Sequence, residues 1–232
     1  MKLSIIIPVY NEAAHISELL FYLLSSLKNP KDAEILVVDG GSTDGTQKVV
    51  AEFTTAHNVI ALKSRKGRGA QMNFGATHAK SEVLYFLHAD SYPPQFFDYY
   101  IQTAIEKSNL AGCFKMKFDH SHWWLQLAGW FTQFNVKFFR GGDQSLFIQK
   151  ALFEKLNGYP ETHAIFEDFN LIRKLYQNNQ FTVIQHSITS SSRRYVENGI
   201  AQLQYHYWML YLKKWFGAST DSLVTYYKKN IK

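Results

Sequence analysis

Cysteine is nearly absent from the chain, because Cys113 is the only one among its 232 residues. A single thiol excludes an internal disulfide and also a zinc site that needs several cysteine ligands. The sequence also lacks any run of about 20 uninterrupted apolar residues, so no ordinary membrane span is expected. Its first apolar run is short and is cut by Pro8 and Asn11, so no secretion signal is expected either. These absences favour a reducing cytoplasm and leave association with the inner face of the membrane open.

Acidic residues are fewer than basic ones: 19 Asp and Glu stand against 25 Lys and Arg, a formal net charge of +6. This excess favours an anionic partner, such as a phosphate, a nucleic acid or an acidic membrane face. Hydrophobic residues make up 46% of the chain, which is enough apolar surface for a folded core and excludes intrinsic disorder as the main state. No linker, low-complexity tract or internal repeat divides the chain, so residues 1–232 are predicted to form a single domain.

Short apolar runs and helix-like segments alternate along the first half of the chain. The runs predict buried parallel strands, and the segments between them predict helices that cover the sheet. The predicted strands are 3–9, 34–39 and 83–88, and the predicted helices are 12–27, 43–54 and 69–79. The fold class is therefore α/β.

The second half is less regular and predicts mixed pairing within the central sheet. Its predicted strands are 112–118, 145–149 and 182–185, and a helix is predicted from about Asp168. In such sheets ligands bind outside the carboxyl ends of the strands, so the polar residues at these ends are the first candidates for a site.

The segment DGGSTDGT follows the second predicted strand. Asp39 stands at the strand end beside free backbone donors, a combination that a nucleotide base or ribose can use. The alternative is a tight glycine turn with Asp44 as a helix cap, which gives no reason for Asp39. We therefore favour a binding role for Asp39 and a cap for Asp44. The segment is not a P-loop, because Gly45 is followed by Thr46 instead of lysine.

Four basic residues, Lys63, Arg65, Lys66 and Arg68, precede a helix predicted to open near Gly69. Side-chain cations beside the positive end of a helix dipole favour a diphosphate. The alternative is an ordinary solvated basic loop.

His88 and Asp90 end the third apolar run and emerge together at the sheet edge. A carboxylate with substrate phosphate suits Mn²⁺ or Mg²⁺, and histidine suits Mn²⁺ better. The alternative is that Asp90 caps the loop that follows. A third ligand could come from His186, although a lone histidine is more often structural.

Glu167 and Asp168 begin a predicted helix, where acids complement the helix dipole. An acid held ionised at such a place also makes a general base for a hydroxyl. Arg193 and Arg194 follow a serine run and could clamp a phosphate or acceptor, and Asp143 has a similar status. For these three residues the alternative is a solvated loop.

Many of the aromatic residues gather in two stripes at helical spacing, and each stripe predicts an amphipathic helix. Packing on the core or in a homodimer is favoured over binding at a membrane interface. The first stripe is Trp123, Leu127, Trp130, Phe131, Phe134 and Phe138; the second is Ala201, Tyr205, Trp208, Leu212 and Trp215.

Five segments occur in an order that resembles family 2 glycosyltransferases over residues 3–200. They are IIIPVYNE, VVDGGSTDGT, KGRGAQMNFGA, LHAD and FEDFNLIRKL. The chain is most similar to small bacterial members associated with arsenosugar biosynthesis. The resemblance implies the A-type, Rossmann-like nucleotide-sugar fold with a mixed sheet and helices on both faces.

The resemblance also implies an organisation of the chain and a reaction. Residues 1–110 would bind the nucleotide, 111–200 would carry the acceptor and catalytic groups, and 201–232 would form a C-terminal amphipathic helical segment. A sugar would pass, with inversion and metal assistance, from a UDP- or GDP-type donor to an acceptor hydroxyl, for which a lipid-linked acceptor is one candidate.

Residue roles follow from the matching positions. The diphosphate would lie near Arg65 and Arg68. Asp90 matches the second acid of the family's D-x-D element and would ligate Mn²⁺ or Mg²⁺, whereas His88 takes the place of the first acid. The residues that would hold the base and ribose are Pro8, Tyr10, Glu12 and Asp39. Asp168 matches the catalytic base, with Glu167 beside it.

Two other classes of protein are alternatives to this enzyme. A basic module that binds nucleic acid would fit the net charge and the aromatic residues, but it explains neither the acids at the strand ends nor their order, so no nucleic acid is expected. A scaffold at the membrane surface that keeps the fold without catalysis would fit the two aromatic stripes.

Overall fold

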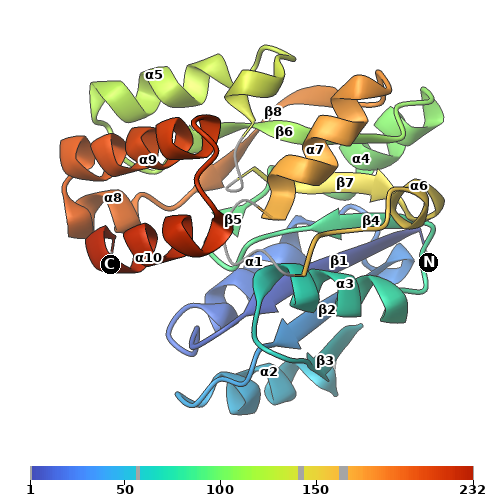
Figure 1. Cartoon of the computed structure of the whole chain (residues 1–232). Coiled ribbons are helices and arrows are strands. Elements are labelled where there is room, and N and C mark those ends of the chain that lie inside the picture. Colours follow the sequence, from blue (N-terminus) through green and yellow to red (C-terminus); the bar gives the residue numbers. More distant parts are fainter. Residues whose placement is uncertain (1, 56–57, 141–143, 162–166, 232) are drawn as a thin grey trace.

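The centre of the molecule is one mixed sheet that runs through both halves of the chain (Figure 1). The computed structural model describes residues 2–55, 58–140, 144–161 and 167–231. The strands are β1 Leu3–Val9, β2 Ala33–Asp39, β3 Val59–Lys63, β4 Val83–Phe86, β5 Ser91–Tyr92, β6 Ala111–Phe118, β7 Leu146–Gln149 and β8 Thr182–Ser190. Across the sheet they are ordered β3-β2-β1-β4-β7-β6-β8-β5.

β1, β2, β3 and β4 are parallel, as expected for the buried runs of branched residues in β1, β2 and β4. The three predicted strands are confirmed, although β4 ends at Phe86, before the predicted end at 88. β3 was not predicted from the sequence. β3 is the outermost strand on one side of the sheet. Buried, half-buried and exposed residues are mixed along it, so it lacks the continuous apolar run that is typical of a central strand.

The remaining strands, β5 to β8, include both directions. β7 is antiparallel to β4 and β6, β6 is parallel to β8, and β5 is antiparallel to β8. The predicted mixed pairing is confirmed. β8 continues past the predicted end at 185 to Ser190, where it pairs with Ser91 of β5.

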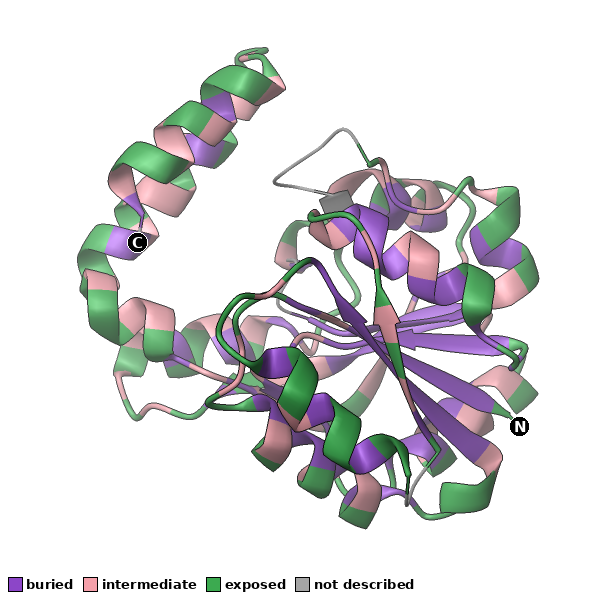
Figure 2. Ribbon diagram, turned by 90° about the horizontal axis from the view of Figure 1, so that it is seen from below, coloured by how far each residue is buried: buried purple, intermediate pink, exposed green. Residues whose placement is uncertain are grey.

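Helices cover both faces of the sheet, which confirms the α/β fold (Figure 2). One face packs on α1 Ile16–Ser26, α2 Thr46–Thr54 and α4 Phe97–Glu106. The other face packs on α3 Arg68–His78, α6 Lys150–Lys155 and α7 Glu167–Gln177. The short 3-10 helix η1, Pro30–Asp32, leads into β2.

The first helix starts later than predicted, at Ile16 instead of residue 12. Asn11 has a left-handed backbone, with φ of 55°. The amide groups of Glu12 and Ala13 donate to side chains of the Asp39–Thr46 segment instead of entering a helix. The polar loop after β1 is therefore fixed by the loop after β2.

The first aromatic stripe was predicted to form one helix, and this prediction is wrong. α5 spans Trp123–Phe131, and a separate 3-10 helix, η2, spans Lys137–Phe139. The guanidinium of buried Arg140 donates to the carbonyl oxygens of Thr132, Phe134 and Val136. In a continued helix these carbonyls would accept amide groups four residues further on, so Arg140 replaces the helical bonds that would extend α5.

Three helices complete the chain: α8 Arg193–Asn198, α9 Ile200–Trp215 and α10 Thr220–Asn230. They lie at the end of the molecule away from the N-terminus (Figures 1 and 2). α9 and α10 share a small cluster of Leu203, Leu210, Leu223 and Ile231. The second aromatic stripe faces away from this cluster and is exposed, so the interpretation that it packs on the core is wrong. Within the described ranges, no helix has the length and apolar character needed to cross a membrane.

Candidate functional site

The carboxyl ends of β1, β2 and β4 meet at one edge of the sheet. Val9 pairs with Asp39, and the amide of Gly40 donates to the carbonyl of Val9 at 3.0 Å. On the other side of β1, the amide of Leu87 donates to the carbonyl of Ile6 at 3.0 Å. The sheet pairing thus brings the residues after all three strands together, although they lie far apart in the sequence.

Asp39 is buried at the end of β2, with its carboxylate facing the glycine turn. It accepts the amide of Ser42 at 3.0 Å, the Ser42 hydroxyl and the side-chain amide of Gln47. Asp44 accepts the hydroxyl of Thr46 at 2.6 Å and the amide of Thr46 at 3.0 Å at the start of α2. The hydrogen bond from the Thr46 hydroxyl, followed by that from the Ala13 amide, lowers the pKa of the Asp44 carboxyl. Asp44 therefore serves the predicted cap function, while Gly45, with φ of 94°, occupies the cap position itself.

The side chain of Gln71, in α3, links the ends of β1 and β2, and we call this link the Gln71 brace. This role of Gln71 was not predicted from the sequence. Its buried side-chain amide donates to the carbonyl of Val9 at 2.8 Å and to that of Val38 at 2.7 Å. A Cβ atom on Gly40 would come within 3.0 Å of the Gln71 side chain, so only glycine fits here without displacement. This brace fixes the spacing between the ends of β1 and β2.

The residues predicted for the nucleotide lie around this edge. Pro8 lies in β1 and is its one residue that is not fully buried. The Lys66 ammonium lies over the exposed ring of Tyr10, 3.5 Å from the ring centre, so the loops after β1 and β3 meet in a cation–π contact. Arg68 is the first residue of α3 and is half-buried.

Arg65, predicted to lie near a diphosphate, pairs with the carboxylate of Glu161. Asn73 of α3 holds the segment around Glu161. Its side-chain amide donates to Glu161 at 3.0 Å and to the carbonyl of Tyr159 at 2.9 Å, and its side-chain oxygen accepts the amide of Tyr159 at 3.0 Å. A diphosphate that binds Arg65 would have to compete with Glu161.

Glu12, Asp90 and Arg193 form a charged group at the centre of the edge. Nη2 of Arg193 lies 3.8 Å from Oε1 of Glu12. Burial raises the pKa of the Glu12 carboxyl, and the nearby Asp90 carboxylate raises it further, while Arg193 acts in the opposite direction. β5 and β8 hold the Asp90 loop, because the amide of Ser191 donates to the carbonyl of Asp90 at 3.0 Å.

These residues fit a divalent cation only with ligands supplied by a substrate. In the described part of the chain, no three His, Cys, Asp or Glu side chains converge on a metal position, and Asp90 forms no ion pair. The Asp90 carboxylate lies close enough to Glu12 to disfavour a second negative charge. One carboxylate with phosphate oxygens is a donor set that suits Mg²⁺ or Mn²⁺.

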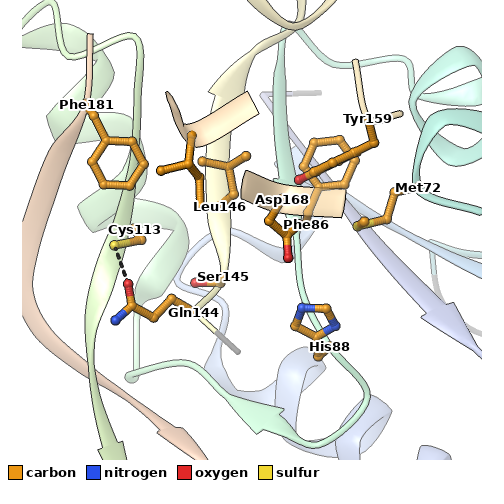
Figure 3. A pocket seen from close by; sticks show the side chains of 11 residues that line it. Met72, Phe86, His88, Cys113, Gln144, Ser145, Leu146, Tyr159, Asp168 and Phe181 are labelled. Atoms are coloured by element: carbon orange, nitrogen blue, oxygen red, sulfur yellow. Dashed lines mark hydrogen bonds between the residues drawn. The ribbon is translucent and has the colours of Figure 1, made fainter. Parts of the chain in front are cut away.

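Asp168 and His88 line one small cavity (Figure 3). The Asp168 carboxylate comes from the first turn of α7 and points toward the side of the cavity where His88 lies. Most of the remaining lining is apolar, with Met72, Phe86 and Ile172 among the residues. The cavity measures about 10 Å³, room for about one water molecule, so a sugar would bind outside it.

The remaining predicted residues take different places. Arg194 donates to the Tyr227 hydroxyl of α10 at 3.3 Å, whereas its neighbour Arg193 lies at Glu12. His186 stacks on Tyr100 at 3.7 Å between ring centres, which favours its structural interpretation. Glu167 begins α7, but its side chain, like the whole of Asp143, lies outside the described residues.

Asn11 lies just beyond the end of β1, among the polar residues expected at this edge, although no role was predicted for it. Its amide donates to the Ser42 hydroxyl at 2.9 Å, and its side-chain oxygen accepts the amide of Thr43 at 2.9 Å. It therefore ties the loop after β1 to the glycine turn after β2. Its place directly after an apolar strand was the available signal.

Comparison with curated proteins finds glycosyltransferases. The chain is 26% identical over 199 residues to the probable glycosyltransferase YdaM of Bacillus subtilis, which covers 75% of this chain and 46% of YdaM. It is 37% identical over 95 residues to the glycosyltransferase AglE of Haloferax volcanii, which covers 40% of this chain and 31% of AglE. The chain thus spans less than half the length of either relative.

Solved structures share the fold. The structure of S. aureus TarS residues 1–349 in complex with UDP aligns with a TM-score of 0.71 at 22% identity, covering 82% of this chain and 60% of that one. The mannosyltransferase PcManGT from Pyrobaculum calidifontis, in complex with GDP-Man and Mn²⁺, aligns with a TM-score of 0.65 at 19% identity, covering 90% of this chain and 60% of that one. These likenesses agree with the A-type fold. The family model of glycosyl transferase family 2 matches residues 4–216, nearly the whole chain, and the protein belongs to this family.

Proposed function

We propose that this protein is an inverting glycosyltransferase that moves a sugar from a nucleoside diphosphate to an acceptor hydroxyl. The observation that carries the proposal is the gathering of Asp39, Glu12 and Asp90 at one sheet edge, with Asp168 and His88 in an adjoining cavity. The ligands named for TarS and PcManGT, which are UDP, UDP-GlcNAc and GDP-Man, support a donor of the UDP or GDP type.

The donor's nucleoside would lie over the ends of β1 and β2. Asp39 is buried there and already accepts two donors from Ser42, so its carboxylate is fixed in direction. A fixed acceptor at this place can take a hydrogen bond from a ribose hydroxyl or from a base N–H group. Tyr10 offers an exposed ring beside it for contact with the base.

The diphosphate would lie between the start of α3 and the Glu12 and Arg193 pair. Arg68, Arg193 and the positive end of the α3 dipole favour negative charge there, and Arg65 joins them when it leaves Glu161. When bound at Asp90, Mn²⁺ or Mg²⁺ supplies positive charge that stabilises the departing nucleoside diphosphate. The protein's own cations favour the same departure.

Asp168 is the proposed general base. Its carboxylate takes the proton of the acceptor hydroxyl while that oxygen forms a bond to the anomeric carbon of the sugar. The bond from the anomeric carbon to the diphosphate oxygen breaks, and its electron pair leaves with the nucleoside diphosphate. A single displacement from the opposite face inverts the anomeric centre and needs no covalent intermediate on the enzyme.

The proposal also covers the subgroup of family 2 to which the chain belongs and the chemical class of the acceptor. The LHAD, GDQ and SSRR segments favour the group of small bacterial members associated with arsenosugar biosynthesis. The acceptor offers a hydroxyl, on either a lipid-linked or a small polar molecule.

The test is Asp168→Asn, which keeps the shape of the side chain and removes the base. Release of UDP or GDP from UDP-GlcNAc or GDP-mannose should fall about 100-fold or more, while the rise in unfolding temperature given by the nucleotide alone stays unchanged. Glu154→Gln, at an exposed position on α6, is the matched control and should keep full turnover. If Asp168→Asn turns over at the wild-type rate, Asp168 is not the base.

A further inference from the structure

The described surface carries a set of large apolar side chains that no helix or strand covers. α5 and the segment after it present one row, and α9 presents the other. Their exposed fractions run from 37% at Leu127 to 87% at Phe138. We call these residues the aromatic face: Trp123, Leu127, Trp130, Phe134 and Phe138 in the first row, and Tyr205, Trp208, Leu212, Trp215 and Phe216 in the second.

The two rows adjoin each other. The ring of Trp124 in α5 meets that of Trp208 in α9 edge to face, with centres 5.8 Å apart, and its indole N–H donates to the Gln204 side chain at 3.1 Å. α5 and α9 also lie at the same end of the molecule (Figure 1). The aromatic face is therefore one surface of two helices.

Apart from the contact of Trp208 with Trp124, the aromatic face contributes little to the packing of the helices that carry it. α5 turns Leu125 and Gly129 inward, and α9 turns Leu203 and Leu210 inward, so each helix already has a buried side. Contiguous exposed apolar surface of this kind marks a place of interaction.

Charge indicates the kind of partner. The segments that carry the aromatic face, residues 120–142 and 198–220, contain no Asp or Glu, although the chain has 19 acids. They contain Lys137, Lys213 and Lys214, and Lys228 and Lys229 follow on α10. A two-fold contact between copies would set this basic surface against itself, because the same patch faces itself across such an axis.

We propose that the aromatic face docks the protein on a membrane surface that carries anionic lipid headgroups. Tryptophan, tyrosine and phenylalanine rings enter the interfacial layer, where their apolar bodies leave water and their polar groups stay hydrated. Lys137 beside the first row is exposed, as are Lys228 and Lys229 of α10, and these lysines reach the phosphates on extended aliphatic stems. Binding of this kind depends both on the apolar area that enters the interface and on attraction to anionic lipids.

Docking in this way would bring the candidate site to the membrane. The Lys214 ammonium of α9 lies 3.9 Å from the ring centre of Phe169, the residue that follows Asp168 in α7. The C-terminal end of the aromatic face is thus next to the start of α7. An acceptor hydroxyl at the headgroup level would lie on the same side of the molecule as Asp168.

The test is co-sedimentation of the full chain with vesicles, without nucleotide. Vesicles of phosphatidylcholine and phosphatidylglycerol should bind the protein, vesicles of phosphatidylcholine alone should bind it less, and added salt should weaken binding. Phe138→Ser combined with Trp215→Ser should reduce binding roughly tenfold or more. Both side chains are more than four-fifths exposed, at 87% and 82%, so the fold should remain.

Phe21→Ser is the matched control, because Phe21 is 62% exposed on α1, outside the aromatic face. It should bind vesicles as the wild type does. Absence of binding to anionic vesicles, or equal loss in the control, would overturn the proposal. A dimer in light scattering that the double variant disrupts would overturn it in favour of a second copy. Vesicle binding needs no turnover, so Asp168→Asn should bind normally, and failure here would leave the proposed function standing.

Discussion

Nη2 of Arg193 lies 3.8 Å from Oε1 of Glu12, which links the start of α8 to the loop after β1. The two residues come from opposite ends of the chain, and β5 brings them together by pairing with β8. Burial raises the pKa of the Glu12 carboxyl, Arg193 opposes this rise, and the nearby Asp90 carboxylate adds to it.

Glu12→Gln should make the protein more stable at pH 7. The pKa of Glu12 is raised above its ordinary value of 4.5, so the folded state binds the proton more tightly than the unfolded state does. Stability from this group is full below pH 4.5 and is lost as pH rises through the raised pKa. Urea unfolding of variant and wild type should therefore differ at pH 7 and converge below pH 4.5.

Glu52→Gln, at an exposed position on α2, is the control and should change stability little at either pH. A Glu12→Gln variant that is less stable than the wild type at pH 7 would show that the Arg193 contact outweighs burial.

Gln71→Leu should lower the free energy of unfolding by about 1–3 kcal/mol, because it leaves the carbonyls of Val9 and Val38 without their side-chain donor. Gln202→Leu, at an exposed position on α9, should stay within about 0.5 kcal/mol of the wild type in the same denaturant titration. Equal stability of Gln71→Leu and wild type would mean that the brace contributes nothing.

Asp39→Asn should weaken binding of UDP or GDP about tenfold while changing the unfolding temperature little. Asparagine keeps an oxygen that can accept the Ser42 amide, but it removes the negative charge that a nucleoside N–H or hydroxyl would meet. Asp44→Asn gives the opposite pattern, because Asp44 fixes the start of α2 and lies outside the proposed nucleoside contact. It should lower the unfolding temperature and leave nucleotide affinity unchanged. Isothermal titration calorimetry with each nucleotide separates the two, and tight binding by Asp39→Asn would remove Asp39 from the site.

Local sequence patterns predicted the parts of the fold that depend on local chemistry. The apolar runs of β1, β2 and β4 had to be buried, and the polar residues after them had to lie at their carboxyl ends. The positions of Asp39 and Asp90 at the sheet edge follow from that pattern alone. The position of Asp168 in the first turn of α7 was also predictable, because acidic residues that precede apolar residues at helical spacing are typical of the start of a helix.

Features that depend on distant partners were not predictable in this way. The Gln71 side chain can link the two strand ends only at their spacing in the folded sheet. α5 ends where it does because Arg140 donates hydrogen bonds to the carbonyls of Thr132 and Phe134, in a segment whose sequence has helical spacing. Periodicity showed that α9 has two unlike sides, but only the packing on α10 shows that the aromatic side faces outward.

The most direct test of the central claim is thermal unfolding with UDP and with GDP, each with and without Mn²⁺, in the wild type and in Asp90→Ala. A ligand that binds only the folded state must raise the unfolding temperature. We expect a rise with one nucleotide that increases with Mn²⁺ in the wild type, and no such increase in Asp90→Ala. No rise with either nucleotide at millimolar concentration would contradict a donor site at this sheet edge.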